Sequence, residues 1–252
     1  MSTTEQLNQA WFELWRKNKF SQASIVVVGA GAIGNNVILG LAGFGVGKIT
    51  IIDGDIIELH NLNRQIAFTE EDASENRYKS DVLADKVRVI SPEIQVHSIK
   101  EYITPENVEK LVGTPDVIVE GVDNVLCRVI LSRYALIKNI PLVHSATSHL
   151  GGEIGVITRN TACIECFYTS MIQRSCADNP VPAVVYSNMV IGALVVENVR
   201  ILLQPLNETE KPITPLLYYE VERPDRFWKV ELKRKPECVC NKILKEVGEK
   251  ND

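Results

Sequence analysis

The amino-acid sequence predicts an α/β protein with a doubly wound, mostly parallel sheet and a C-terminal antiparallel extension. Three observations support this fold class. Apolar, β-branched runs alternate with helical patterns up to about residue 146. A Gly-x-Gly-x-x-Gly sequence lies between the first of these runs and the next helix. Beyond about residue 146 the pattern changes, and two segments near the C-terminus show the alternation of antiparallel strands.

Each element follows from a local pattern. A first helix is predicted over residues 4–19, where four apolar side chains recur on one face: Leu7, Trp11, Leu14 and Trp15. The run SIVVV (24–28) is continuous and β-branched, which is typical of a buried strand. Further strands are predicted over residues 48–53, 94–99, 116–121, 141–146 and 153–158. Further helices are predicted over residues 32–44, 74–90, 125–138 and 184–203.

Local sequence signals also place helix ends and the last two strands. Ser91-Pro92 should end the helix over 74–90, and Thr104-Pro105 should begin a short helix. A Pro-containing connection over 204–215 leads to residues 216–222 and 226–233, which should pair as a hairpin. The parallel strands should place a ligand at their carboxyl ends.

Composition narrows the class of protein. The chain has 252 residues, of which 45% are hydrophobic and 23% charged, an ordinary globular balance. A net charge of −5 argues against a general nucleic-acid binder. No apolar run approaches the roughly 18 residues of a membrane span, and the N-terminus lacks a signal-peptide pattern, so we expect a cytoplasmic protein. Six cysteines are too few for a disulfide scaffold.

The glycine sequence predicts a Rossmann-like nucleotide site. Gly29, Gly31 and Gly34 stand between a strand and a helix whose first N–H groups can face a phosphate. Asp53 follows Gly34 by 19 residues, at the end of the second strand, where a carboxylate can bind ribose hydroxyls. These residues serve NAD and ATP equally well.

Further charged residues favour nucleotidyl transfer over hydride transfer. Arg64, Lys79 and Asp123 should all lie at the carboxyl edge of the sheet. Two cations can neutralise charge on an α-phosphate and a carboxylate can hold Mg²⁺, whereas a nicotinamide site needs neither. Taken singly, each residue has a simpler interpretation. Arg64 could be a surface cation, Lys79 a solvated helix residue, and Asp123 an N-cap for the helix at residue 125.

Four motifs together resemble the adenylating domain of the ubiquitin-activating (E1-like) superfamily, and within it the MoeB/ThiF/HesA group. The motifs are GAGAIG, IDGDIIELHNLNRQ, RYKSDVLADKVRVISP and GVDNVLCR. The resemblance runs from about residue 20 to residue 242. It implies that Asp53 binds ribose, that Arg64 and Lys79 act on the ATP phosphates, and that Asp123 holds Mg²⁺. It also implies that further residues shape the nucleotide pocket: Asp55, Asn61, Gln65 and Asn124. Arg128 could support the site or only pack.

The cysteines suggest a metal site. Cys163 with Cys166 and Cys238 with Cys240 form two close pairs, and four thiolates suit a closed, structural Zn²⁺ site. The resemblance also favours zinc, although its usual second pair is Cys-x₂-Cys and the one-residue spacer here should strain the chelate. The alternative is four thiols without metal. With zinc bound, we expect a single domain over 1–252, with an N-terminal helix (1–19), a nucleotide-binding core (20–160) and a zinc-stapled extension (161–252).

Two other cysteines and the histidines are interpreted separately. The resemblance suggests that Cys176 could accept the activated acyl group, and the alternative is a plain loop cysteine. Cys127 should be a small core residue. No role is assigned to any of the four histidines, and His97 and His144 are interpreted as core or strand residues.

The resemblance implies ATP-dependent adenylation of a C-terminal carboxylate. The expected partner is a small ubiquitin-like or sulfur-carrier protein ending in Gly-Gly, with a separate sulfur donor or conjugating enzyme and a homodimeric enzyme. Relatives often carry an N-terminal arginine that reaches the partner subunit's ATP, and here only Arg16 precedes the glycine loop. Three alternatives stay open: an NAD-dependent oxidoreductase, a tRNA-modifying adenylating dehydratase, and a non-catalytic scaffold.

Overall fold

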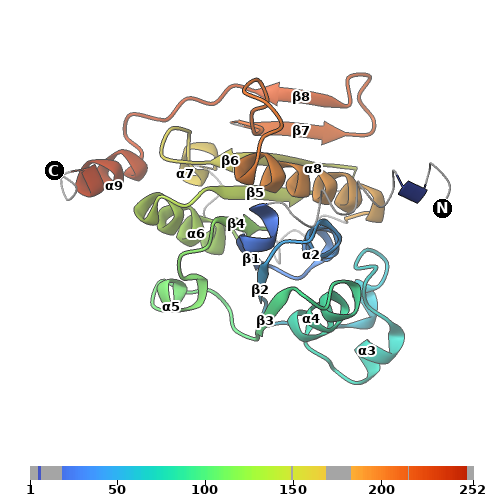
Figure 1. Ribbon diagram of the computed structural model, residues 1–252. Helices are drawn as coiled ribbons and strands as arrows, with labels where there is room; N and C mark the ends of the chain where they lie inside the picture. Colours follow the sequence, from blue (N-terminus) through green and yellow to red (C-terminus); the bar gives the residue numbers. More distant parts are fainter. Residues whose placement is uncertain (1–4, 7–18, 149, 169–182, 215, 249–252) are drawn as a thin grey trace.

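The computed structural model describes residues 5–6, 19–148, 150–168, 183–214 and 216–248. Most of the helix predicted over 4–19 lies outside these residues, together with Arg16 and Cys176. The elements discussed below all belong to the described part of the chain, and Figure 1 shows their arrangement.

Eight strands form one sheet in the order β3-β2-β1-β4-β5-β6-β7-β8. Their bounds are Ser24–Val28 (β1), Lys48–Ile52 (β2), Gln95–Ile99 (β3), Val117–Glu120 (β4), Leu142–Thr147 (β5), Gly151–Ile157 (β6), Leu216–Glu220 (β7) and Phe227–Val230 (β8). Strands β1 to β5 pair in parallel, whereas β6, β7 and β8 are added antiparallel. This arrangement confirms the predicted fold class, including the antiparallel extension.

Helices cover both faces of the sheet, as a doubly wound fold requires (Figure 1). One face packs against α2 (Ala32–Phe44), α4 (Lys79–Ile90) and α8 (Val185–Leu203). The other packs against α5 (Val108–Val112), α6 (Val125–Lys138), α7 (Ile164–Phe167) and α9 (Val239–Gly248). Alternate residues of β1 serve the two cores: Ile25 and Val27 face the first, and Val26 and Val28 face the second. Short helices α3 (Glu70–Ser74), η1 (Lys19–Gln22) and η2 (Leu59–Asn61) complete the described elements.

The helix predicted over 74–90 begins later, at Lys79, and a separate short helix that was not predicted, α3, precedes it. α3 ends at Ser74 and α4 begins at Lys79, with Asn76 between them in the left-handed region at φ 52°. The intervening turn is held by Arg77, whose guanidinium pairs with Asp72 at 2.9 Å and Asp85 at 2.6 Å. These ion pairs join the two helices across the break. Helical periodicity alone continues through the segment, so the sequence pattern did not reveal the interruption.

The short helix expected at Thr104-Pro105 begins later, at Val108, with Asn107 at the N-cap position. The Asn107 side chain accepts a hydrogen bond from the Thr104 backbone N–H at 2.8 Å, so residues 105–107 form a turn before the helix starts. The sequence analysis did not predict α7 or α9. Each follows the first cysteine of a pair, and α7 is only four residues long.

Helix α8 is long and apolar enough to cross a membrane when judged by length and composition alone, although the sequence analysis expected no such segment. The apolar composition of α8 is also explained by its close packing against α2 inside the protein. A Cβ placed on Gly192 would lie 2.6 Å from Asn36 Cβ of α2, and one on Gly40 would lie 2.8 Å from Val196 of α8. The two helices therefore approach closely at small residues, and α8 supplies Ile191, a fully buried side chain, to the core.

Candidate nucleotide site and cysteine cluster

The glycine loop joins β1 to α2 and depends on two of its glycines for its shape. Gly29 has φ 95°, and a Cβ there would lie 2.7 Å from the carbonyl oxygen of Gly121. A Cβ on Gly34 would lie 2.1 Å from the carbonyl oxygen of Gly29. Gly31 is the N-cap of α2, and around it the space is open, the nearest side-chain atom being Gln65 Nε2 at 3.9 Å. The start of α2 thus offers backbone N–H groups at an open position, which suits a phosphate.

Asp53 follows β2 and lies directly against this loop. Its Oδ2 accepts a hydrogen bond from the Ala30 N–H at 2.6 Å, and its Oδ1 accepts one from the Asp55 N–H at 2.8 Å. Burial raises the pKa of Asp53, and the positive charge of Lys79 offsets only part of that effect. The predicted ribose-binding carboxylate therefore stands beside the glycine loop, as the spacing of 19 residues indicated.

Lys79, the first residue of α4, is buried and pairs with Asp55 at 2.7 Å. Tyr102, which follows β3, donates its hydroxyl hydrogen to the other oxygen of Asp55 at 2.5 Å. Burial alone would raise the pKa of Asp55, but these two hydrogen bonds outweigh it and the pKa is lowered. The bond to Asp55 also raises the pKa of Tyr102 to about 12. Sequence reasoning missed Tyr102, because no local motif marks it.

The segment that carries Arg64 crosses near the start of α2. Asn61 is buried and accepts a hydrogen bond from the Glu58 N–H at 3.0 Å, which shapes the turn of η2. Gln65 is also buried, and its Oε1 has no hydrogen-bond partner among the described residues. A buried amide oxygen without a partner is costly, so it is available to a ligand donor. Arg64 is half-buried and donates to the His60 carbonyl oxygen at 3.1 Å.

The turn between β4 and α6 carries Asp123 and Asn124, both exposed. Asn124, not Asp123, is the N-cap of α6, because its side chain accepts a hydrogen bond from the Cys127 N–H at 3.2 Å. The simpler interpretation of Asp123 as the helix cap was therefore wrong. Arg128 is buried behind the turn and donates to the Val122 carbonyl oxygen at 2.5 Å.

The structure thus brings three separate segments to the glycine loop. Gln65 lies beside Gly31, Asp53 is bonded to Ala30, and Gly121 lies against Gly29. Lys79 reaches the same edge through Asp55, and Ser80 donates to the Asp53 carbonyl oxygen at 3.1 Å. These contacts bring together the polar segments that the sequence placed at the carboxyl ends of the strands.

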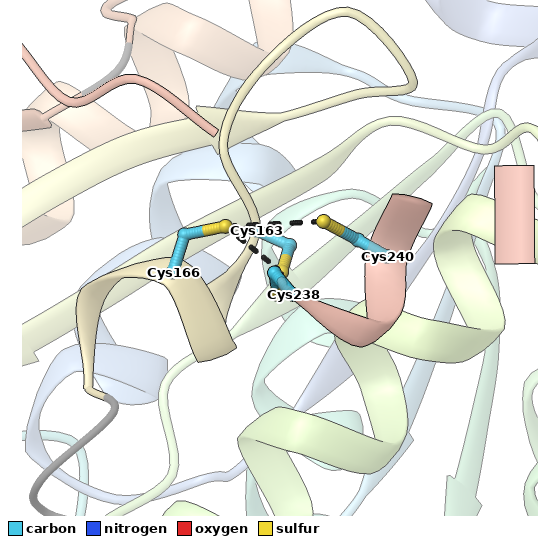
Figure 2. Close-up of side chains that lie close together, drawn as sticks. All are labelled: Cys163, Cys166, Cys238 and Cys240. Atoms are coloured by element: carbon cyan, nitrogen blue, oxygen red, sulfur yellow. Dashed lines mark hydrogen bonds between the residues drawn. The ribbon is translucent and has the colours of Figure 1, made fainter. Parts of the chain in front are cut away.

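Four cysteine sulfurs converge where α7 meets the start of α9 (Figure 2). The Sγ atoms of Cys163, Cys166, Cys238 and Cys240 all lie within 4.8 Å of one another. Neighbouring Sγ atoms are 3.5 Å apart for Cys163 and Cys238, and 3.8 Å apart both within the first pair and between Cys166 and Cys240. A tetrahedral zinc site with Zn–S bonds of about 2.3 Å has sulfur–sulfur edges of about 3.8 Å. The donor set therefore fits such a metal ion.

Local structure brings each pair into place. Cys163 is the N-cap of α7 and accepts the Cys166 N–H through its carbonyl oxygen, while Cys240 lies in the first turn of α9. Burial raises the pKa of Cys163, and it raises that of Cys240 to about 12, so neutral thiols are favoured there without a cation. For Cys166, hydrogen bonds outweigh burial and lower the pKa. A bound cation would stabilise all four sulfurs as thiolates.

The sequence was compared with known families and proteins. The sequence model of the ThiF family matches residues 4–241. A sulfur carrier protein adenylyltransferase from Thermus thermophilus is 30% identical over 241 residues, covering 89% of this chain and 84% of that protein. The chain belongs to the ThiF family. This confirms the resemblance that the four motifs indicated.

Other relatives of this ThiF-family chain differ in length. The SAMP-activating enzyme E1 of Haloferax volcanii is 28% identical, covering 89% of this chain and 82% of that protein. The adenylyltransferase and sulfurtransferase MOCS3-1 of Zea mays is 36% identical over 71% of this chain. The chain spans only 38% of the length of that maize protein.

Solved structures show the same fold. A crystal structure of Escherichia coli MccB with MccA-N7isoASN has a TM-score of 0.78 at 22% identity, covering 95% of this ThiF-family chain and 75% of that one. A structure of MccB with ATP has a TM-score of 0.74 at 24% identity, covering 89% and 68%. At this identity the likeness establishes the fold alone.

Proposed function

We propose that the chain uses ATP to adenylate the C-terminal carboxylate of a small ubiquitin-like or sulfur-carrier protein. One observation carries the proposal. A glycine loop bonded to a half-buried aspartate is flanked by a buried lysine and by a buried amide oxygen that has no hydrogen-bond partner among the described residues. Membership of the ThiF family supports it, and so do two relatives, one named as a SAMP-activating enzyme E1 and the other as a sulfur carrier protein adenylyltransferase. The alternative of an NAD site leaves the buried Lys79 and its ion pair with the half-exposed Asp55 without a use.

In the proposed reaction, the start of α2 binds the phosphates of ATP and Asp53 binds the ribose. A carboxylate oxygen of the carrier attacks the α-phosphorus. The bond from that phosphorus to the bridging oxygen breaks, which gives an acyl-adenylate and pyrophosphate. Arg64 and Lys79 stabilise the charge that develops, so no strong general base is needed. Magnesium, held by Asp123, would neutralise phosphate charge.

The remaining nucleotide residues have supporting roles in this proposal. Asp55 orients Lys79 through their 2.7 Å ion pair, and Gln65 and Asn61 shape the pocket beside Gly31. Asn124 holds the turn that carries Asp123 by capping α6.

Further steps and partners belong to the proposal as well. The carrier would end in Gly-Gly and the enzyme would act as a homodimer. Cys176, which lies outside the described residues, would accept the activated acyl group before a sulfur donor or conjugating enzyme acts.

The cysteine cluster would hold a structural Zn²⁺ in this protein. All four ligand positions are filled by sulfur from Cys163, Cys166, Cys238 and Cys240, so a water position for catalysis does not remain. The ion would join α7 to α9, two elements that are far apart in the sequence. Its proposed contribution is to stability and not to the chemical step.

The decisive experiment is ATP–pyrophosphate exchange in the presence of ubiquitin-fold proteins that end in Gly-Gly, with nicotinamide nucleotide binding measured in parallel. Exchange that depends on one such carrier is expected. Nicotinamide binding without ATP binding would overturn the proposal.

A matched pair of variants sharpens this test. Arg64→Ala should lower the exchange rate by about 100-fold or more, because it removes a charge that stabilises the transition state. Arg88→Ala, which removes a surface arginine paired with Asp85, should leave the exchange rate unchanged. Equal rates for both variants would contradict the role of Arg64.

A further inference from the structure

A row of buried charged side chains crosses the sheet beside the proposed nucleotide site. Glu120 is the last residue of β4, His144 lies in β5 and Glu153 lies in β6. Glu120 and His144 are fully buried, and Glu153 is 9% exposed. His144 Nδ1 lies 2.6 Å from Glu120 Oε2, and its Nε2 lies 3.2 Å from Glu153 Oε1. The imidazole therefore joins the two carboxylates.

The position of this row on the sheet is informative. Val26, Ile118 and Leu142 face each other in register and belong to the apolar core on this face. Two residues further along the same strands, the row becomes Val28, Glu120 and His144. On β4 and β5 the face thus changes from apolar to charged, and Glu120 makes this change at the carboxyl end of β4, next to the turn that carries Asp123. Buried ion pairs cost desolvation free energy, and apolar side chains would fill the space at no such cost.

Charges in the cluster balance when His144 is protonated. Burial alone would lower the pKa of His144, but the charge and hydrogen bonds of the two carboxylates outweigh it and the pKa is raised. Burial would raise the pKa of Glu153, and its bond to His144 outweighs that effect, so the pKa is lowered. Arg128, 7% exposed, supplies a second cation, with its Nε 3.5 Å from Glu120 Oε1. Two carboxylates thus face two cations.

The cluster is bonded to the turn that carries Asp123. Glu120 Oε1 accepts the Val122 N–H at 3.2 Å, and Arg128 donates to the Val122 carbonyl oxygen at 2.5 Å. Both backbone polar groups of Val122 are therefore held from behind, one residue before Asp123. On its far side the cluster is tied to Tyr168, which follows α7, with its hydroxyl 3.3 Å from His144 Nε2. Hence, a change at His144 should be transmitted to the turn through Glu120.

We propose that Glu120, His144 and Glu153 are positioning residues that, together with Arg128, fix the turn over residues 122–124 for a magnesium-bound nucleotide. This inference rests on the proposed function, since it assigns a purpose to the same site. The inference explains why charged side chains are buried behind Asp123. It also predicts that His144 controls the turn over residues 122–124, which it does not touch.

The test compares His144→Gln with Asn198→Ala. His144→Gln removes the imidazolium and leaves Glu120 without that partner. The second is a matched control, because Asn198 is fully buried and its Oδ1 accepts the Ile213 N–H at 2.7 Å on a different part of the fold. Both variants should lower stability, so stability alone does not separate positioning from packing. Glu153→Gln is a milder second variant, since it keeps the shape of the side chain and removes only its charge.

Hydrogen–deuterium exchange of the ATP-free chain gives the first measurement. His144→Gln should speed exchange of the amides of residues 121–127 by about tenfold relative to Asn198→Ala, and Glu153→Gln should speed it by a smaller factor. Unchanged exchange in this segment would overturn the inference, whether or not the chain binds ATP.

Nucleotide titration gives the second measurement. In the presence of Mg²⁺, His144→Gln should weaken ATP binding by roughly tenfold, with little change when Mg²⁺ is chelated, because outer partners of a metal site tune its affinity by such factors. A magnesium-dependent affinity equal to that of the wild type would overturn the inference. Failure of the wild-type chain to bind ATP at all would instead overturn the proposed function, which keeps the two failures distinct.

Discussion

At the scale of single residues, the glycine loop shows how a missing side chain shapes a site. Gly34 lies inside α2, where a Cβ would come within 2.1 Å of a backbone oxygen, and backbone cannot move aside as a flexible side chain can. Gly43, in the same helix, has nothing within 4 Å of its Cβ position. The two glycines therefore differ in function although both are helical.

Replacing each of these glycines by alanine should give opposite results. Gly34→Ala should lower the free energy of unfolding by about 2 kcal/mol or more through overpacking. Gly43→Ala should raise it by roughly 0.5–1 kcal/mol, because alanine favours the helix. Urea denaturation of both variants measures the difference. A Gly34→Ala variant as stable as the wild type would show that the close approach to Gly29 is not required.

A second residue-scale prediction concerns pH. The pKa of folded His144 is raised above its ordinary value of 6.5. Protonation of His144 therefore contributes stability that is fully present below about pH 6.5 and is lost as the pH rises through the raised value. Urea denaturation between about pH 6 and pH 9 should show this decline in the wild type and a weaker decline in His144→Gln. Identical pH profiles for the two proteins would contradict the protonated state.

At the scale of elements, the cysteine pairs connect two helix starts that the chain separates widely. The first pair precedes and enters α7, and Arg133 of α6 ties this helix down through Glu165 at 2.6 Å. The second pair enters α9, where Asn241 bonds back to the Lys235 carbonyl oxygen at 2.8 Å. The one-residue spacer of the second pair is accommodated at the start of a helix, and its sulfurs still meet those of the first pair.

Removing one thiol should therefore weaken a long-range connection. Cys238→Ser should reduce bound zinc to a small fraction of one ion per chain and lower the melting temperature by roughly 5–10 °C. Cys127→Ser is the matched control, because Cys127 lies in α6 outside the cluster and its loss should leave the metal content unchanged. Elemental analysis together with thermal unfolding measures both. Equal zinc content in the two variants would eliminate the proposed site.

At the scale of the whole molecule, one sheet connects the nucleotide loop to the cysteine-bearing extension. β6, β7 and β8 extend the sheet beyond β5, so the strands after residue 150 belong to the same layer as the parallel strands. This continuity supports the proposal that residues 1–252 act as a single domain. The row from Glu120 to Glu153 runs across the same sheet and reaches Tyr168 at the end of α7.

Much of the fold followed from periodicity. The strand over 24–28 and the helices over 32–44 and 125–138 have the predicted bounds, because each is a long, uniform pattern with a clear cap or turn. The late start of α4 did not follow, since helical periodicity does not show the turn at Asn76 or the ion pairs of Arg77 with Asp72 and Asp85 that hold it. The later start of α5 had a similar cause: the side chain of Asn107 binds the backbone of Thr104.

The candidate site also has features that the sequence predicted and features that it did not. Motif spacing predicted that Asp53 would stand by the glycine loop, and chemistry predicted that two close cysteine pairs would meet. Spacing could not predict Tyr102 on Asp55, or Asn124 in place of Asp123 as the helix cap. The Tyr102–Asp55 contact depends on which loops face each other once the sheet has formed, whereas the cap depends on the local backbone at the start of α6.

By itself, the sequence determined the order of the strands, the glycine loop and the convergence of two cysteine pairs, because these depend on local pattern and on the chemistry of few residue types. Only the tertiary structure decided that Glu120, His144 and Glu153 form one buried row. These residues come from three strands, and their contact exists only in the register that the assembled sheet imposes. Strand register is a cooperative property of the packed fold, so no single segment encodes it.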